Sequence, residues 1–437
     1  MDLESLSREE LIAVILGQQA AIAQLQARVQ DLETRLGKGG HKGMPGLKPK
    51  AAQSSPPRQP RKPRKQQFAR LRATPTARVT HAQDKCPHCG THLEGGSVKY
   101  SREVIELPLQ PVEVTEHAFI ERHCPLCERE VMPVDALEGV VMGKQRLGAG
   151  LVSLITALRE GGRLPFRIIQ WYLETFHQLK LSVGAIVAVV QKVARASLQV
   201  LEGIQAKVRS SAVVMADETG WREDGANGYV WTFSTPEECF FVRGNRSKQV
   251  VDSVLGEEFG GVLVSDFYAA YNHYPGLHQR CWAHLLRDIK DLEGLYPADQ
   301  SLRQWAEAVK KLYWEAKAFS HCEEEERLRA QQHFERELRR ICAPFLVDQG
   351  AAQRRLCLRI ERFLQELFVF VGYPFVPADN NGAERSLRHV VTSRKISGGS
   401  RSPLGSQTKT ILASLFATWR LQGLNPLSAC RQLLLSP

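Results

Sequence analysis

The sequence lacks any apolar run approaching the roughly 18–20 residues that cross a bilayer, which argues against a transmembrane protein. Its N-terminus also lacks a basic segment followed by an apolar stretch and a small-residue cleavage site, so we expect no secretion. We therefore expect a cytoplasmic, nucleoid-associated protein with no membrane partner. Cysteine is scarce, with 10 in 437 residues, which is too few for a disulfide scaffold.

Acidic residues are absent from residues 38–80, which carry twelve Lys and Arg. The net charge of the whole chain is +11, so the remainder is close to neutral. The segment is also rich in Gly, Pro, Ser and Gln, a composition that buries no core. We predict a disordered basic linker that binds nucleic-acid phosphates, with a solubilising tether as the alternative. The linker residues expected to contact DNA are Arg61, Lys62, Arg64 and Lys65.

A heptad seam precedes this linker, with positions that alternate three and four residues apart between residues 4 and 36. The seam positions are Leu11, Ile15, Gln18, Ile22, Leu25, Val29, Leu32 and Leu36. Only Gln18 is polar, and one polar seam residue can set the register of a coiled coil. The pattern predicts a leucine-zipper-like coiled coil over residues 1–37, which would make the protein a homo-oligomer. The alternative is an amphipathic helix packed on its own chain.

Two Cys-x-x-Cys pairs predict a four-Cys zinc-binding domain over residues 81–142. The expected ligands of one structural Zn²⁺ are Cys86, Cys89, Cys124 and Cys127. Two thiolates in a tight turn point to one side, and two such turns complete a tetrahedral site. Strand-like stretches near 98–107 and 112–122 predict a zinc ribbon with a long β-hairpin. A redox pair is the alternative, and the candidate substitutes for one cysteine ligand are His88, His92, His117 and His123.

Three helical stretches over residues 143–205 resemble a helix-turn-helix unit, with Ser182 as a candidate cap of the last helix. That last helix is mostly Ala, Val and Ile, and its basic residues Lys192 and Arg195 come late. A recognition helix should expose polar or basic residues near its start. A packing module and a DNA-reading module are therefore equally favoured.

Residues 206–292 change to β and then α, in the order β-β-β-α-β. The first apolar strand runs into Asp217, and the fourth ends in Asp266. This order predicts an α/β, RNase H-like catalytic domain with a mixed five-stranded sheet. Residues 293–370 have helical periodicity with dense Glu and Arg, which predicts an all-helical insertion. Residues 371–437 would complete the catalytic domain with a helix that carries Glu384.

Three carboxylates are candidates for a catalytic site: Asp217, Asp266 and Glu384. We expect each aspartate near the end of a short strand on the sheet. Two divalent ions about 3.5–4 Å apart can activate water and stabilise the leaving oxygen of a phosphodiester. Mg²⁺ prefers carboxylate oxygens, and Mn²⁺ can substitute for it. The competing acids are Glu218, Asp224, Asp288 and Asp379. Glu218 should face away from Asp217, and Asp379 suits a helix cap.

Three blocks of sequence resemble the DDE motifs of the insertion-sequence-sixty-six family of bacterial transposases. They are MADETGWREDGANGYVWTFST, LVSDFYAAYNHYPGLHQRCWAHLLRDIKDL and DNNGAERSLRHVVTSRKISGGSRSPLGSQT. That family has a zipper-like segment, a four-Cys zinc finger, a helix-turn-helix region and an RNase H-like domain with a helical insertion. The resemblance implies that Asp217, Asp266 and Glu384 are the DDE triad, which binds two Mg²⁺ ions.

Two further features lie beside these acids. Cys281 and His284 match a Cys-x-x-His feature of the family; we favour a structural brace over a second zinc site. A basic cluster follows Glu384, and a strand-positioning DNA surface is favoured over a solvated helix face. The cluster consists of Arg385, Arg388, Arg394, Lys395 and Arg401.

The sequence as a whole predicts a DDE transposase. We expect it to bind the terminal inverted repeats of a bacterial insertion sequence, cleave DNA there and join the freed 3′ end to target DNA. Double-stranded DNA and a second copy of the chain are the expected partners, and accessory proteins encoded by the same element are a further expectation. The alternatives are an RNase H-like nuclease that cuts without joining, and a non-catalytic zinc-dependent DNA-binding protein.

Overall fold

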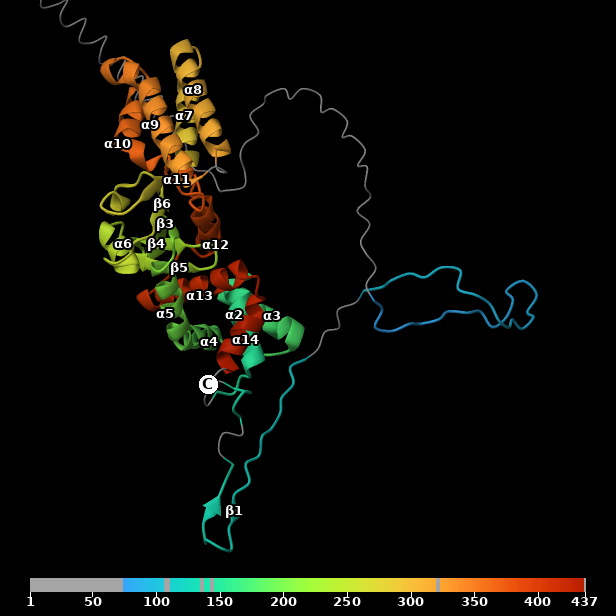
Figure 1. Ribbon diagram of the computed structural model, residues 1–437. Helices are drawn as coiled ribbons and strands as arrows, with labels where there is room; N and C mark the ends of the chain where they lie inside the picture. The colour runs from blue at the N-terminus through green and yellow to red at the C-terminus, as the bar shows by residue number, and fades with distance from the viewer. Residues whose placement is uncertain (1–73, 106–110, 134–136, 142–144, 320–322, 436–437) are drawn as a thin grey trace, which may run out of the picture. The chain divides into compact units, whose positions relative to one another are not determined.

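The computed structural model describes residues 74–105, 111–133, 137–141, 145–319 and 323–435 (Figure 1). The chain divides into two compact units, Met1–Ile105 and Glu106–Pro437. The coiled coil predicted over residues 1–37 lies outside the described residues, as does most of the basic linker with Arg61, Lys62, Arg64 and Lys65. Those assignments stay predictions.

A five-stranded mixed sheet forms the centre of the second unit. Its strands are β3 (Val213–Glu223), β4 (Ala226–Ser234), β5 (Cys239–Gly244), β6 (Val262–Ser265) and β7 (His278–Arg280). They lie in the order β5-β4-β3-β6-β7, with β3, β4 and β5 antiparallel and β3, β6 and β7 parallel. The predicted β-β-β-α-β order is confirmed, and the sheet is compatible with an RNase H-like domain.

The two faces of the sheet bury different sets of helices. Trp231 and Phe233 of β4 share one core with α6 (Lys248–Leu255) and the N-terminal helical region. Val230 and Trp221 face the other way and pack against α12 (Asn381–Ser397) and α13 (Pro403–Leu421). Alternation along β3 therefore puts odd-numbered residues such as Asp217 on the face that α12 covers.

The predicted helical region contains four helices, one more than expected. They are α2 (Ala149–Glu160), α3 (Phe166–His177), α4 (Val183–Ala196) and α5 (Leu198–Arg209). Ser182 Oγ accepts a hydrogen bond from Ala185 N, which confirms the predicted cap. This region shares its core with α14 (Pro426–Leu435) and with the sheet. No single described helix is long and apolar enough to cross a membrane, although the bent pair of α4 and α5 meets that test by length and composition alone.

The segment predicted as a helical insertion, residues 293–370, consists of helices and their connections where it is described, and its first helix begins earlier, at Trp282. Its elements are α7 (Trp282–Leu295), α8 (Gln300–Ala318), α9 (Glu324–Val347), α10 (Arg354–Arg362), η3 (Leu364–Glu366) and α11 (Val369–Gly372). The insertion has its own apolar core, which extends to Val213, Val262 and Val264 of the sheet. Because Val264 pairs with Met215, the insertion packs on the same face of the sheet as α12.

The predicted long β-hairpin between the two cysteine pairs is wrong for the described residues. Residues 98–105 and 112–121 form no strand, and nearly all of them are exposed. A β-hairpin at these residues would bury little apolar surface, because no described apolar side chains cover either segment. Pairing instead flanks the second cysteine pair, where β1 (Arg122–His123) runs antiparallel to β2 (Glu130–Val131).

Candidate active site

Asp217 lies in the middle of β3, not near the end of a short strand as predicted. The strand continues to Glu223 because β4 pairs with it along nine registered positions. The hairpin closes at Asp224 and Gly225, which both adopt the left-handed conformation with φ of 50° and 79°. An Asp-Gly pair favours this two-residue turn. That dipeptide was the sequence signal for the longer strand.

Asp266 follows β6 directly, and hydrogen bonds hold both its side chain and its backbone. Its Oδ1 accepts a hydrogen bond from Tyr268 N at 2.8 Å. Its backbone carbonyl accepts from Arg280 Nη1 at 2.8 Å and from Ser265 Oγ at 2.9 Å. Because β6 lies parallel to β3 and next to it, Asp266 leaves the sheet beside Asp217.

Glu384 lies in the first turn of α12, and the DNNGAER segment docks that turn on β3. Asn380 is fully buried and donates from Nδ2 to the Ala216 carbonyl at 2.7 Å. A side chain at Gly382 would place its Cβ 2.4 Å from Met215 Sδ, so glycine permits the close approach. Asp379 Oδ1 accepts from Asn381 N at 3.1 Å, in keeping with its predicted role at the helix start.

The three predicted acids act on one another electrostatically. The pKa of Asp217 is raised to about 7, first by burial and then by the neighbouring Glu218, Asp266 and Glu384 carboxylates; a hydrogen bond from the Glu218 amide opposes the shift. Like charges at one site, taken out of water, disfavour ionisation. The cluster therefore carries repulsion that a bound cation would relieve.

These carboxylates suit a divalent ion by their chemistry, since Mg²⁺ and Mn²⁺ prefer hard oxygen ligands. As the side chains stand in the part of the chain that the structure describes, no three or more His, Cys, Asp or Glu form a ready-made metal site. The residues thus fit the expected ions in type and in charge, and the magnesium assignment stays a prediction.

Glu218 projects from the opposite face of β3, as expected, but it belongs to a polar network of its own. Its carboxylate accepts from Arg246 Nη2 at 2.8 Å and from Tyr271 Oη at 2.9 Å, and its side chain is only 4% exposed. Burial raises its pKa, and Asp266 adds to the shift, while Arg246 and Tyr271 lower it. Glu218 therefore lies close enough to the acid cluster for its charge to act on Asp217 and for the charge of Asp266 to act on it.

Cys281 and His284 serve different neighbours at the start of α7. Cys281 is buried, and its Sγ accepts a hydrogen bond from Asn380 N at 3.1 Å. Burial raises the pKa of the Cys281 thiol to about 11. His284 Nε2 lies 3.7 Å from Glu384 Oε1, and Arg287 Nη2 lies 3.8 Å from the same oxygen. These contacts join α7 to α12, which the bracing interpretation requires.

The basic cluster around α12 divides into two groups. Four of its residues are exposed to solvent, namely Arg385, Arg388, Lys395 and Arg401. Arg394 instead donates from Nη1 to Thr219 Oγ1 at 2.9 Å and to the Gly220 carbonyl. Arg394 thus braces α12 on β3, a role that no feature of the sequence indicated.

The two cysteine pairs form turns with the same hydrogen bonds. Cys86 N donates to Thr91 O and Gly90 N to Cys86 O, both at 2.9 Å. Cys124 N donates to Arg129 O and Glu128 N to Cys124 O at the same distance. The fourth residue after the first cysteine is left-handed in both turns, with φ of 78° at Gly90 and 53° at Glu128.

Hydrogen bonds also favour the thiolate form of one cysteine in each pair. The pKa of Cys89 is lowered by its contacts with Thr91, and that of Cys124 by the backbone amides of Cys127 and Leu126. A thiolate is the form that binds zinc. The turns lie in different units, and the shared Zn²⁺ site stays a prediction.

Comparison with known proteins relates the chain to a protein family and to a curated protein. The model of a protein family described as "Transposase IS66 family" matches residues 144–408, more than half of the chain. An uncharacterized protein, y4jO, of Sinorhizobium fredii (strain NBRC 101917 / NGR234) is 30% identical over 166 residues. That alignment covers 38% of this chain and 49% of the relative, so the chain spans about half the length of this curated protein.

Proposed function

Because the chain belongs to the IS66 family of transposases, we propose that it is a DDE transposase of a bacterial insertion sequence. It binds the terminal inverted repeats of the element, cleaves one strand at each end and joins the freed ends to target DNA. The family assignment gives the transposase role with DNA as partner. The order of chemical steps and the residues that perform them are part of the proposal.

The observation that carries the proposal is the acid cluster on the sheet. Asp217, Asp266 and Glu384 come from β3, from the end of β6 and from α12. Burial raises the pKa of Asp217 to about 7, and the carboxylates of Glu218, Asp266 and Glu384 add to the shift. Ionisable groups with strongly shifted pKa values gather at functional sites. Burial makes the largest contribution to this shift, and the carboxylates beside Asp217 add to it, as expected where acids gather around a cation site.

In this proposal Asp217, Asp266 and Glu384 hold two divalent ions. When bound, such ions supply activation of the attacking oxygen and stabilisation of the leaving oxygen in an in-line displacement. The three carboxylates fix the place of the reaction, and Asn380 and Gly382 keep Glu384 close to β3. In the first step water attacks the phosphorus and the 3′ oxygen leaves as a hydroxyl. In the second, that hydroxyl attacks target DNA and displaces another 3′ oxygen.

The exposed cations of the basic cluster would position the DNA strand. Arg385 and Arg388 lie on the same helix as Glu384, while Lys395 and Arg401 lie at its end and just beyond it. Phosphate contacts of this kind fix the register of a duplex without reading its sequence. The braced Arg394 contributes less directly, by holding α12 on β3.

The N-terminal parts complete the proposal. The zinc-binding domain and the basic linker hold the inverted repeats, and the coiled coil brings two or more copies to the paired ends. Similar turns at both cysteine pairs support a zinc site with four thiolates. Accessory proteins of the same element would act at this assembly.

The decisive experiment is a strand-transfer assay with labelled duplexes that carry the inverted repeats flanking the gene. In Mg²⁺ or Mn²⁺ the protein should nick intact ends and should join pre-cut ends to a plasmid. A structure-specific nuclease would cut without joining, and a DNA-binding regulator would only retard the duplex. In Ca²⁺ we expect DNA binding without turnover. Joining by Asp217→Asn at the wild-type rate would refute the assignment of the site.

A further inference from the structure

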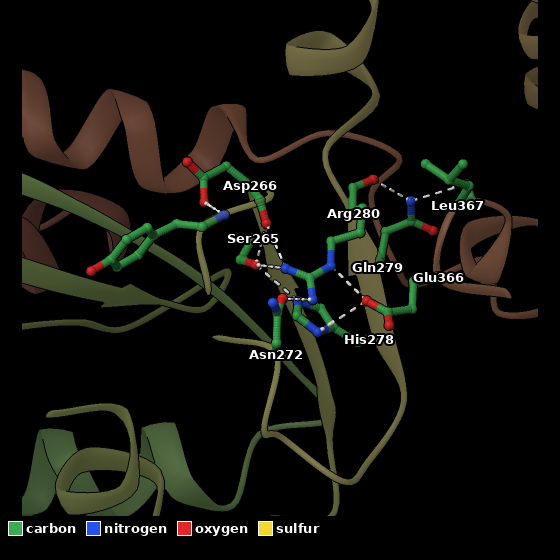
Figure 2. A network of polar contacts seen from close by, with 9 residues as sticks. Ser265, Asp266, Asn272, His278, Gln279, Arg280, Glu366 and Leu367 are labelled. Atoms are coloured by element: carbon green, nitrogen blue, oxygen red, sulfur yellow. Dashed lines mark hydrogen bonds and ion pairs between the residues drawn. The ribbon is translucent and has the colours of Figure 1, made fainter. Parts of the chain in front are cut away.

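The edge strand β7 is unusual because all three of its residues are polar and buried. His278, Gln279 and Arg280 are 5%, 0% and 1% exposed. Buried polar groups require hydrogen-bond partners, and these partners come from two directions (Figure 2). One set surrounds Asp266, and the other belongs to the end of the helical insertion.

On the side of the active site, Arg280 is hydrogen-bonded to the backbone of Asp266. Its Nη1 donates to the Asp266 carbonyl at 2.8 Å, and its Nη2 donates to Asn272 Oδ1 at 2.8 Å. Ser265 Oγ donates to the same Asp266 carbonyl and contacts His278 Nε2 at 2.8 Å. Figure 2 shows the guanidinium between Asp266 on one side and Glu366 on the other. A cation from the neighbouring strand thus fixes the backbone from which the Asp266 side chain leaves the sheet.

Toward the insertion, β7 is fastened to the segment that contains η3 and α11. Gln279 Nε2 donates to the Leu367 carbonyl at 3.1 Å, and Gln279 Oε1 accepts from Phe370 N at 3.0 Å. Trp282 Nε1 donates to the same Leu367 carbonyl. Glu366 precedes these contacts, and its Oε2 lies 2.5 Å from Arg280 Nε.

Glu366 neutralises the buried charge of Arg280. A guanidinium this deeply buried is costly without a counter-ion, and Glu366 is the carboxylate that contacts it. The negative charges of Glu366 and, more weakly, of Asp266 both favour the ionised form of Arg280. Removal of the Glu366 charge would leave Arg280 free to turn toward Asp266.

We propose that Arg280 is a positioning residue for Asp266 and that Glu366, acting through Arg280, makes docking of the helical insertion a condition for a competent metal site. The inference rests on the proposed function, because it concerns the second acid of that site. Partners behind a metal ligand typically contribute about 10–100-fold in metal affinity or activity when they are removed.

The chain offers a matched pair of variants for the test. Glu366→Gln and Glu361→Gln each remove one carboxylate that pairs with an arginine Nε, at 2.5 and 2.9 Å, from side chains 31% and 35% exposed. Only Glu366 reaches Arg280; Glu361 pairs with Arg339. Mn²⁺ binding would be followed by the paramagnetic resonance signal of free Mn²⁺, and DNA nicking by a Mg²⁺ titration.

We expect Glu366→Gln to weaken Mn²⁺ binding by about tenfold and to move the Mg²⁺ midpoint of nicking upward by a similar factor. High metal concentration should restore most of the rate, because the ligands themselves remain. Glu361→Gln should stay within about twofold of wild type in both measurements. Arg280→Lys keeps the charge but carries its donors on a single nitrogen, which cannot take the separate positions of Nε, Nη1 and Nη2, so it should lose at least as much.

Equal behaviour of the two Gln variants would overturn the inference. A loss in Glu366→Gln that excess metal does not restore would also overturn it, because that outcome indicates general damage to the fold. If wild-type protein neither binds Mn²⁺ nor cuts DNA, the proposed function itself fails, and that result is separate from either of these.

Discussion

Two carboxylates of this chain, the buried Glu160 and the partly buried Asp217, have opposite charge environments. Glu160 on α2 is 1% exposed and contacts Lys409 Nζ at 2.6 Å and His389 Nε2 at 3.1 Å. Burial alone would raise its pKa, but Lys409 and His389 outweigh burial and lower the pKa to about 2. For Asp217 burial acts in the same direction as its acidic neighbours, and the pKa rises to about 7.

The contrast separates a structural role from a functional one. Helix α12 contributes to both places, since it brings His389 to Glu160 and Glu384 to the acid cluster. The Glu160 cluster is complete, because its cations lie within the fold and join α2 to α12 and α13. The Asp217 cluster keeps its repulsion, which disfavours folding unless a ligand relieves it. We interpret the Glu160 cluster as a structural ion-pair network that stabilises the fold, and the Asp217 cluster as a cation-binding site.

The largest effect should come from neutralising the acids of the Asp217 cluster. Asp217→Asn, Asp266→Asn and Glu384→Gln should each fold and bind DNA yet lose cleavage by roughly a thousandfold or more, because each removes a metal ligand. Pairs of these changes should cost little more than one, since a site without one ligand is already defective. Single-turnover nicking in Mg²⁺ measures the loss.

The control for that series is Asp252→Asn, which removes an exposed carboxylate of α6 and should leave nicking unchanged. Glu218→Gln is a poor control, because Glu218 is bound to Arg246 and Tyr271 beside the cluster. If the three acid variants nick DNA as fast as Asp252→Asn, the cluster is not catalytic.

The paired cluster should respond in stability. Lys409→Met would leave Glu160 buried with a single partner, and loss of one member of a buried ion pair costs about 3–5 kcal/mol. Urea unfolding should show this as a lower midpoint with an unchanged slope. Arg339→Met, which breaks an ion pair near the surface, should cost about 1 kcal/mol or less. Similar costs for both variants would mean that Glu160 is not fastened as we describe.

Asp217→Asn should stabilise the protein when metal is absent. The pKa of Asp217 is about 7 in the folded protein against an ordinary value of 3.8, so the folded state keeps the proton to higher pH. The stability that this proton confers is complete below about pH 4 and is lost as pH rises through 7. At pH 8 the variant should therefore be more stable than wild type by about 2–4 kcal/mol, and the difference should vanish near pH 4.

Excess Mg²⁺ should reverse that ranking at pH 8, because bound metal stabilises only the protein that holds it. Thermal unfolding of both proteins with and without Mg²⁺ measures the reversal. A wild-type protein that is as stable as Asp217→Asn in metal-free buffer at pH 8 would contradict the assigned repulsion.

A smaller effect on stability should come from loss of the zinc that we expect at the two cysteine turns. Purified protein should carry about one Zn²⁺ per chain, and Cys124→Ser should lose it without speeding the unfolding of the sheet. Metal analysis by mass spectrometry gives the stoichiometry. Full zinc content in a variant without both cysteine pairs would show that the ion binds elsewhere.

Much of the sheet was predictable, because short apolar strands, an intervening helix and terminal acids stand in a specific order. The length of β3 was not, since pairing with β4 extends it past Asp217 through the turn at Asp224. The strands predicted at 98–107 and 112–122 were wrong over the described residues 98–105 and 112–121, because alternation of residue types cannot reveal that a segment has nothing to pack against.

The polar networks were the least predictable part of the site. Glu160 and Lys409 are 249 positions apart in the sequence, and no local pattern indicates that they meet. Arg394 resembles its exposed neighbours in the sequence, yet it braces α12 on β3. Partners of buried charges are chosen by the packing of distant elements, which residue spacing does not encode.

Anomalous diffraction from crystals of the active protein soaked in Mn²⁺ tests the central claim most directly. The account predicts manganese density in contact with the carboxylates of Asp217, Asp266 and Glu384, and its disappearance in Asp217→Asn. Manganese bound elsewhere, or a protein that cleaves DNA in Mn²⁺ with no density beside these three acids, would contradict it.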